Sequence, residues 1–130
     1  MSRIQVSPFL RNALLIDAAG SAATGALVLV GANALAPLFN LPIALLHGAG
    51  AAIVPFVIWL VWMGTRRALP LAMVNAAIGI NLIWVAASFA LLAFLAPTPL
   101  GYAFIIAQAL AVAFFAALEW MGVKRSAATA

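Results

Sequence analysis

The chain has 130 residues, of which 68% are hydrophobic and 6% are charged, whereas charged residues make up about 25% of a typical soluble domain. This composition excludes a soluble domain, and the six basic residues are too few and too dispersed to form a nucleic-acid surface. Cysteine is absent, which excludes disulfide bonds and thiolate metal sites.

Prolines mark the starts of four long apolar runs. Pro8, Pro42, Pro70 and Pro99 each stand just ahead of such a run, and proline suits the first helical turn because its missing N–H would be unpaired there anyway. The sequence predicts helices at about 9–35, 43–65, 71–95 and 100–123, each longer than the ~20 residues that cross the hydrocarbon of a bilayer. We therefore expect an all-α four-helix bundle that forms a single transmembrane domain over residues 1–130.

The first predicted span carries an acid and a face of small residues. Asp17, Ser21 and Thr24 follow the i, i+4, i+7 pattern, so they share one helix face. Ser21 and Gly25 have the small-xxx-small spacing that permits close approach of another helix. The partner is either a helix of the same chain or a second copy, and the sequence leaves both open.

The second span begins near a lone histidine and ends at two arginines. His47 has no further ligands nearby for a tetrahedral metal site, and one histidine per chain excludes bis-histidine haem ligation within the chain. We therefore interpret His47 as a capping or interfacial residue and expect no metal and no cofactor. Arg66 and Arg67 lie in the short turn before the third span.

The third and fourth spans carry further polar stripes. Asn81, Trp84 and Ser88 line one face of the third span. One face of the fourth span, polar at its ends and apolar between, carries Gln108, Val112, Phe115 and Glu119. Such stripes are expected to point into the bundle, because lipid offers them no hydrogen-bond partner. They either join the helices by hydrogen bonds or line a ligand cavity. The candidate cavity residues are Ser21, Thr24, Asn81, Trp84, Ser88 and Gln108.

The basic residues predict the orientation of the chain. They form three groups: Arg3 with Arg11, Arg66 with Arg67, and Lys124 with Arg125. If the chain crosses the membrane four times, all three groups lie on one side. This side is expected to be the cytoplasm, because Lys and Arg in short flanking segments resist translocation. We therefore expect a multi-pass protein of the bacterial inner (cytoplasmic) membrane with both termini in the cytoplasm. The expected cytoplasmic anchors are Arg11, Arg66, Arg67, Lys124 and Arg125.

Two acids and an asparagine are expected to form one polar layer. Asp17, Asn75 and Glu119 each lie about five residues inside the cytoplasmic end of their spans, which is roughly 7–8 Å at 1.5 Å per residue. An ionisable residue inside a span costs about 2.5–3.5 kcal/mol on insertion scales, so it usually serves a purpose.

This layer has a structural and a functional interpretation. In the structural one, a basic side chain dips into the layer and pairs with the acids; the candidates are Arg11, Arg66, Arg67 and Lys124. In the functional one, the two carboxylates bind a proton or a cation, with Asn75 as a hydrogen-bonding neighbour.

Several short motifs along the chain carry a family resemblance. They are Asp17-Ala18-Ala19 with Thr24-Gly25, His47-Gly48-Ala49-Gly50, Asn81 with Trp84-Val85 and Ser88, Pro97-Thr98-x-Leu100-Gly101-Tyr102, Gln108-Ala109 and Leu118-Glu119-Trp120. With these motifs the chain resembles a family of short, largely uncharacterised four-span bacterial integral membrane proteins. The resemblance covers nearly the whole chain, and it implies no assigned activity.

No catalytic set is recognisable, so we expect no enzymatic activity and no catalytic residue. A serine–histidine–acid set, a phosphate-binding loop and an intramembrane lysine are all absent from the sequence. Our first functional hypothesis is a non-enzymatic inner-membrane protein that acts by self-association or as an accessory subunit of a membrane complex. Its partners are then the lipid bilayer and a second copy or other membrane subunits. The alternative is a small transporter or a ligand- or lipid-binding membrane protein that uses the intramembrane carboxylate pair.

Overall fold

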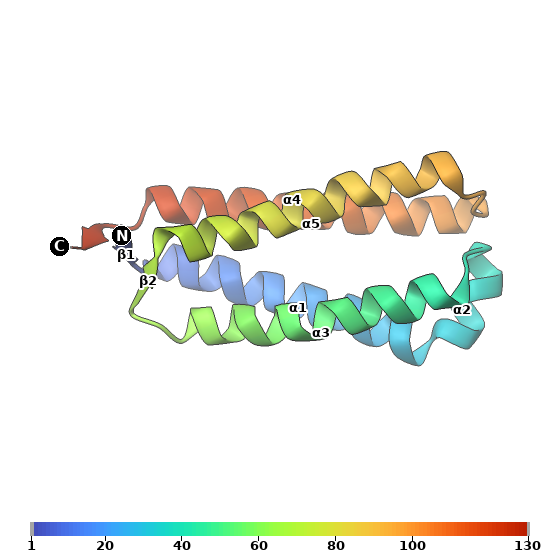
Figure 1. Cartoon of the computed structure of the whole chain (residues 1–130), viewed down its shortest axis with the longest axis horizontal. Helices are drawn as coiled ribbons and strands as arrows, with labels where there is room; N and C mark the ends of the chain where they lie inside the picture. Colours follow the sequence, from blue (N-terminus) through green and yellow to red (C-terminus); the bar gives the residue numbers. More distant parts are fainter. Residues whose placement is uncertain (1, 130) are drawn as a thin grey trace.

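Four long helices run side by side in the computed structural model, which describes residues 2–129 (Figure 1). They are α1 (Pro8–Val30), α3 (Ile43–Gly64), α4 (Leu71–Phe94) and α5 (Pro99–Lys124), and a short helix α2 (Ala32–Phe39) joins α1 to α3. The long helices have 22 to 26 residues, so at 1.5 Å per residue each is at least about 33 Å long and can cross the ~30 Å hydrocarbon core. The predicted all-α bundle of four apolar helices is confirmed.

The first predicted span, 9–35, is wrong at its far end. The helix stops at Val30, and Gly31 separates it from α2, which continues through Pro37 to Phe39. A side chain on Gly31 would come within 2.7 Å of the Leu27 carbonyl oxygen, so glycine is needed for this break. The other three spans differ from α3, α4 and α5 by one residue at most at either end.

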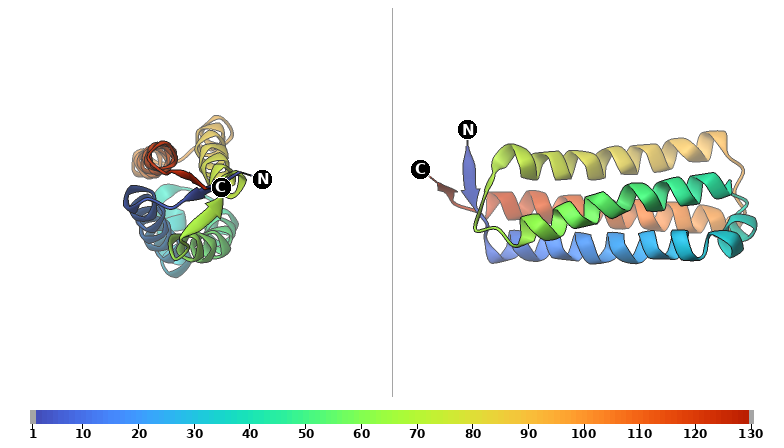
Figure 2. Two further views of the ribbon diagram at one scale, coloured as in Figure 1. Left: turned by 90° about the vertical axis from the view of Figure 1, so that its left-hand side faces the viewer. Right: turned by 60° about the horizontal axis from the view of Figure 1, so that its bottom comes forward.

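The helices are arranged as two hairpins. α1 packs mainly against α3, α4 packs against α5, and α1 also contacts α5, so the hairpins meet along α1 and α5 (Figure 1). The small-residue face of α1 lies in the first hairpin, where a side chain on Gly25 would meet Ile53 of α3 at 2.9 Å. The end-on view in Figure 2 shows the long helices around a common interior.

Both termini lie at the same end of the bundle, joined by a small sheet that the sequence did not predict. Its strands are β1 (Arg3–Gln5), β2 (Ala68–Pro70) and β3 (Ala128–Thr129), in the order β2-β1-β3 with both pairs antiparallel (Figure 2). We refer to this end as the strand end. The basic residues flanking α1, α3 and α5 all lie there, as expected for an even number of spans.

Two clusters of buried apolar side chains hold the bundle together. One lies toward the strand end and includes Leu10, Leu14 and Met63. The other lies toward α2 and includes Val28, Phe39 and Ile105. Along α1, the buried Asp17 and Ser21 lie between Leu14 of the first cluster and Val28 of the second.

Candidate functional site

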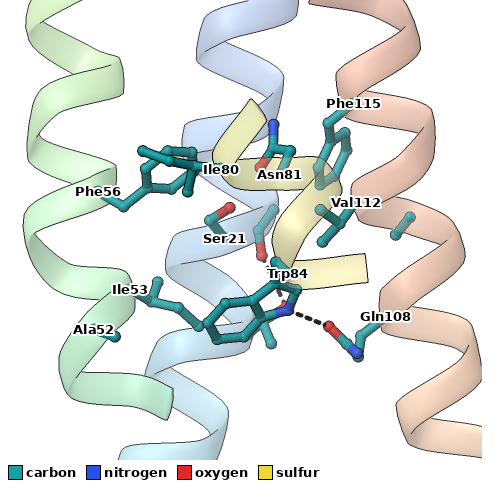
Figure 3. A pocket seen from close by; sticks show the side chains of 13 residues that line it. Ser21, Ala52, Ile53, Phe56, Ile80, Asn81, Trp84, Gln108, Val112 and Phe115 are labelled. Atoms are coloured by element: carbon teal, nitrogen blue, oxygen red, sulfur yellow. Dashed lines mark hydrogen bonds between the residues drawn. The ribbon is translucent and has the colours of Figure 1, made fainter. Parts of the chain in front are cut away.

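A cavity of about 310 Å³ lies between the four long helices in the middle of the bundle (Figure 3). Each long helix contributes to its wall, which is mostly apolar. The lining side chains include Ser21 and Thr24 of α1, Ile53 and Phe56 of α3, Asn81 and Trp84 of α4, and Gln108, Val112 and Phe115 of α5. The wall also contains Ala52 of α3 and Ile80 of α4, which are exposed on the outside of the bundle, so the cavity reaches the lipid-facing surface there.

Five of the six candidate cavity residues line this cavity, and Ser88 does not. Ser88 instead lines a smaller cavity of about 70 Å³ toward α2. Ser88 lies one turn beyond Trp84 on α4, on the α2 side of the Trp84 ring, and its hydroxyl donates to the Trp84 carbonyl oxygen at 2.7 Å. The two cavities share Trp84 and Gln108 in their walls.

The side chains of Trp84 and Gln108 form a polar pair between these two cavities. The indole Nε1 of Trp84 donates to Oε1 of Gln108 at 2.8 Å (Figure 3). Nε2 of Gln108 donates to the Ser88 hydroxyl at 2.8 Å and to the Ile105 carbonyl oxygen at 2.9 Å. All polar hydrogens of Trp84 and Gln108 side chains are therefore used within the protein.

Two carboxyl groups lie just beyond the opposite end of the main cavity. Asp17 and Glu119 are both 0% exposed, and they come from α1 and α5. Asn81 of α4 bridges them, because its Nδ2 donates to Asp17 Oδ2 at 2.8 Å and to Glu119 Oε1 at 3.1 Å. The Ser21 hydroxyl donates to Asp17 Oδ1 at 3.0 Å. Asn81 and Ser21 therefore lie between the cavity, which they line, and the acids, to which they donate hydrogen bonds.

The expected layer of Asp17, Asn75 and Glu119 is corrected in one member. The two acids do come together, but Asn75 is exposed and takes no part in their hydrogen bonds. Asn81 takes its place. The two asparagines are six positions apart in the sequence. This spacing is about 9 Å along an α-helix and about 120° around it, so the two side chains lie at different depths and on different faces.

The acids accept hydrogen bonds from Ser21 and Asn81 and form no ion pair within the described residues, where most of the basic side chains are engaged elsewhere. Arg11 donates to the carbonyl oxygens of Gly64 and Arg66 at 2.8 and 3.3 Å. Arg66, Lys124 and Arg125 lie over the rings of Trp62, Trp120 and Phe9. Arg67 is exposed at the strand end. A buried carboxyl pair without a basic partner is costly, which makes it a candidate functional site.

One carboxyl oxygen is left without a hydrogen bond. Among the described residues, Oε2 of Glu119 is the buried side-chain polar atom that has no partner. Oδ2 of Asp17 and Oε1 of Glu119 accept from the same Asn81 nitrogen, so the two carboxyl groups lie beside each other, but two ionised carboxylates have no proton with which to form a hydrogen bond between them. A single shared proton satisfies this atom and removes one of the two buried charges.

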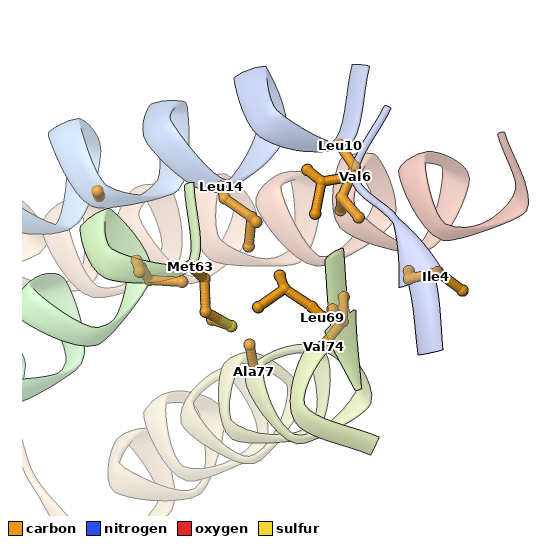
Figure 4. Packing of buried hydrophobic residues seen from close by; sticks show 10 residues of the cluster. Ile4, Val6, Leu10, Leu14, Met63, Leu69, Val74 and Ala77 are labelled. Atoms are coloured by element: carbon orange, nitrogen blue, oxygen red, sulfur yellow. The ribbon is translucent and has the colours of Figure 1, made fainter. Parts of the chain in front are cut away.

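The apolar cluster at the strand end closes the site on the far side of the acids. Figure 4 shows how the side chains of this cluster pack together. Leu10, Leu14, Met63, Leu69 and Val74 are each at most 1% exposed there. The acids therefore lie between this buried apolar cluster and the main cavity. The cavity side is the side on which a ligand can approach them through Asn81 and Ser21.

Ile53 and Phe56 of α3 were not singled out from the sequence, although they make up part of the cavity wall, whereas Val112 and Phe115 lie on the predicted face of α5 that carries Gln108 and Glu119. In a chain that is 68% hydrophobic, apolar residues that face a cavity have the same local pattern as those that face lipid or a neighbouring helix. The polar residues beside them are the only sequence signal that could have indicated this wall.

Neither metal ligands nor a known relative assigns a chemistry to the site. Within residues 2–129, no three histidine, cysteine or acidic side chains lie close enough together to hold a metal ion. His47 is exposed near the start of α3. Comparisons of the chain with protein-family models, with curated proteins and with solved structures give no match, so the family resemblance stays a prediction.

Proposed function

We propose that the protein binds a small, largely apolar molecule inside the membrane, as a small transporter or a ligand-binding membrane protein. The observation that carries this proposal is the cavity of about 310 Å³ between all four long helices, with a buried carboxyl pair at one end. Its volume falls within the range of small-molecule sites, roughly 300–1,000 Å³, and its apolar wall with a few polar groups is typical of them. No catalytic step is part of the proposal.

The cost of the buried acids supports a functional role. A four-helix bundle of this length could pack with apolar residues at positions 17 and 119, and neither carboxyl group gains an ion pair that would offset its desolvation. Both lie next to the cavity instead of facing the basic strand end. Ligand binding gives these groups a purpose that bundle stability does not.

Self-association is less well supported than the sequence suggested. One of the observations behind that hypothesis was the small-residue face of the first span, and this face packs within the chain. Ser21 donates to Asp17 and lines the cavity, and Gly25 lies against Ile53 of α3. A second copy would have to use another face of the bundle.

The orientation expected from the basic residues belongs to this proposal as well. With the strand end in the cytoplasm, the carboxyl pair lies in the cytoplasmic half of the membrane and the α2 end faces outward. Arg66 and Lys124 lie over Trp62 and Trp120 at this end, and interfacial aromatics and basic residues both favour the edge of a bilayer.

Fluorescence of Trp84 tests the binding site directly. Trp59, Trp62 and Trp120 are first replaced by Phe, which leaves Trp84 as the single tryptophan, and the protein is placed in lipid nanodiscs. Titration with tert-butylbenzene is expected to change the Trp84 emission in a saturable way. Its concentration is expressed per lipid, because it partitions into the bilayer.

A pair of matched variants shows whether the signal comes from the cavity. Val112→Phe fills the cavity, whereas Val85→Phe adds the same ring at a half-buried valine that does not line it. We expect the first to weaken saturable binding at least tenfold and the second to leave it within about twofold. A linear, non-saturating response in the parent protein, equal in both variants, would refute the proposal.

A further inference from the structure

Every polar hydrogen on the side chains that line the main cavity is already used within the protein. The hydroxyl of Ser21 donates to Asp17, and that of Thr24 donates to the Gly20 carbonyl oxygen at 3.0 Å. Both hydrogens of the Asn81 amide are directed at Asp17 and Glu119. The N–H groups of Trp84 and Gln108 have acceptors as well. A ligand that needs hydrogen-bond donors from the wall finds none, which excludes most anions.

The end of the cavity next to the acids presents acceptor oxygens instead. Because Nδ2 of Asn81 points at the two carboxyl groups, its Oδ1 lies on the opposite side of the amide, toward the cavity; Figure 3 shows the amide nitrogen turned away from Trp84. This oxygen is not among the fully buried unpartnered atoms and accepts no hydrogen bond from the protein. Ser21 likewise offers only its lone pairs there, since its hydrogen is used on Asp17.

Behind these oxygens lie two acidic groups that have no basic partner. Asp17 on α1 and Glu119 on α5 are the titratable groups of the region, and α4 has none. On α3, the titratable residue is His47, which lies at the α2 end. The nearest basic groups are held at the strand end by carbonyl oxygens and aromatic rings. The field along the cavity therefore favours a positive ligand, and the low dielectric of the interior strengthens that preference.

The remaining wall suits the body of such a cation. Phe56, Trp84 and Phe115 bring aromatic rings to it, and aromatic rings attract ammonium groups through their faces, including ammonium groups that carry no hydrogen. The volume of about 310 Å³ is roughly twice that of a cavity that holds one benzene molecule. A body of one or two rings therefore fits.

We propose that the cavity takes a lipophilic monocation, an ammonium ion with an apolar or aromatic body, in exchange for one proton held between Asp17 and Glu119. In the empty state the pair holds one proton and one negative charge, which gives Oε2 of Glu119 a hydrogen-bond partner. When the cation enters, the proton leaves and the pair carries two negative charges beside one positive ligand. Net charge is conserved, because one positive charge enters and one departs. This inference rests on the proposed function.

Two probes of equal shape isolate the contribution of charge. Phenyltrimethylammonium and tert-butylbenzene differ in charge and hardly in volume, and the quaternary cation has no proton of its own to release. Binding is followed by Trp84 fluorescence in nanodiscs, and proton release by a pH indicator in weakly buffered solution. We expect at least tenfold tighter binding of the cation and release of about one proton for each cation bound.

Glu119→Gln supplies the matched variant, because it keeps the shape of the side chain and removes its ability to ionise. We expect it to weaken binding of phenyltrimethylammonium at least tenfold relative to tert-butylbenzene and to abolish proton release. Saturable binding of tert-butylbenzene by the variant also shows that it is folded. Should this variant fail to fold, the two probes and the proton count in the unaltered protein decide the matter on their own.

The failing outcomes are distinct. Equal affinity for the two probes in the unaltered protein, or cation binding without proton release, overturns the exchange and leaves the cavity as a site for neutral ligands. Failure of both probes to bind overturns the proposed function, and this inference falls with it.

Discussion

Trp84 and Gln108 share a 2.8 Å hydrogen bond from the indole Nε1 to the amide Oε1, and this pair stands between the main cavity and the smaller cavity toward α2. The two side chains come from α4 and α5, so the bond also ties the second hairpin together. Gln108 is held in turn by Ser88 and by the Ile105 carbonyl oxygen. The Trp84 ring is thus fixed in one orientation as a wall of both cavities.

Replacing Gln108 by leucine should release this ring. Gln108→Leu leaves the half-buried indole N–H without an acceptor, and the ~1–3 kcal/mol that this costs for a fully buried group is the upper limit here. We expect Trp84, as the single tryptophan, to show lower fluorescence anisotropy. Ser88→Ala is the control, because it removes a partner of Gln108 and leaves the Trp84 bond in place. Equal loss of anisotropy in both variants would show that the Trp84–Gln108 bond does not hold the ring.

Replacing Asn81 by leucine should destabilise the bundle far more than the same change at Asn75. Asn81→Leu removes two hydrogen bonds to buried carboxyl groups, whereas Asn75 is exposed and outside that network. Hydrogen bonds to charged groups are worth about 1.5–3 kcal/mol each, and measured membrane cases are weaker, so we expect a loss of about 1–4 kcal/mol. Asn75→Leu should change the free energy of unfolding by less than about 0.5 kcal/mol. Unfolding in mixed micelles measures both, and similar losses would contradict the assigned network.

Gly122 of α5 should not tolerate a side chain, because α1 passes directly over it. A Cβ atom there would lie 2.7 Å from the Cα atom of Leu10 and 2.9 Å from its Cβ atom. Backbone cannot move aside as a side-chain tip can, so Gly122→Ala should cost about 1–3 kcal/mol. Gly79→Ala on α4 is the matched control, since nothing lies within 4 Å of its added atom. We expect the control to be neutral or slightly stabilising in thermal unfolding, and a neutral Gly122→Ala would show that α1 and α5 lie farther apart.

Cysteine labelling should place the strand end in the cytoplasm. The chain has no cysteine, so single substitutions give a clean background. Thr65→Cys lies beside the basic turn at the strand end, and His47→Cys lies near the opposite end of α3; both positions are exposed. In intact cells, a membrane-impermeant maleimide should label position 47 and reach position 65 only after the cells are opened. The reverse pattern would invert the proposed topology.

How far the candidate site could be predicted differs from helix to helix. On α1 and α5, Asp17, Ser21, Thr24, Gln108 and Glu119 were placed together by helical periodicity, because a polar side chain in a span has to turn away from lipid. On α4, the same periodicity identified the face of Asn81 and Trp84. Counting residues from the cytoplasmic end of each span, however, placed Asn75 and not Asn81 at the depth of the acids. The small sheet at the strand end was missed altogether, since strands of two or three residues carry no periodic pattern.

The sequence by itself determined the number of spans, their approximate ends and the gathering of the basic residues at one end of the bundle. These follow from hydropathy, proline positions and an even number of crossings, which are properties of one segment at a time. The tertiary structure decided that Asn81 bridges the acids, that the basic groups stay at the strand end, and that a cavity remains beside the carboxyl pair. The physical reason is that the rotation and axial shift of one helix against another are set by close contacts between distant segments. Leu10 against Gly122 and Ile53 against Gly25 are two such contacts, and no single helix contains the information for either.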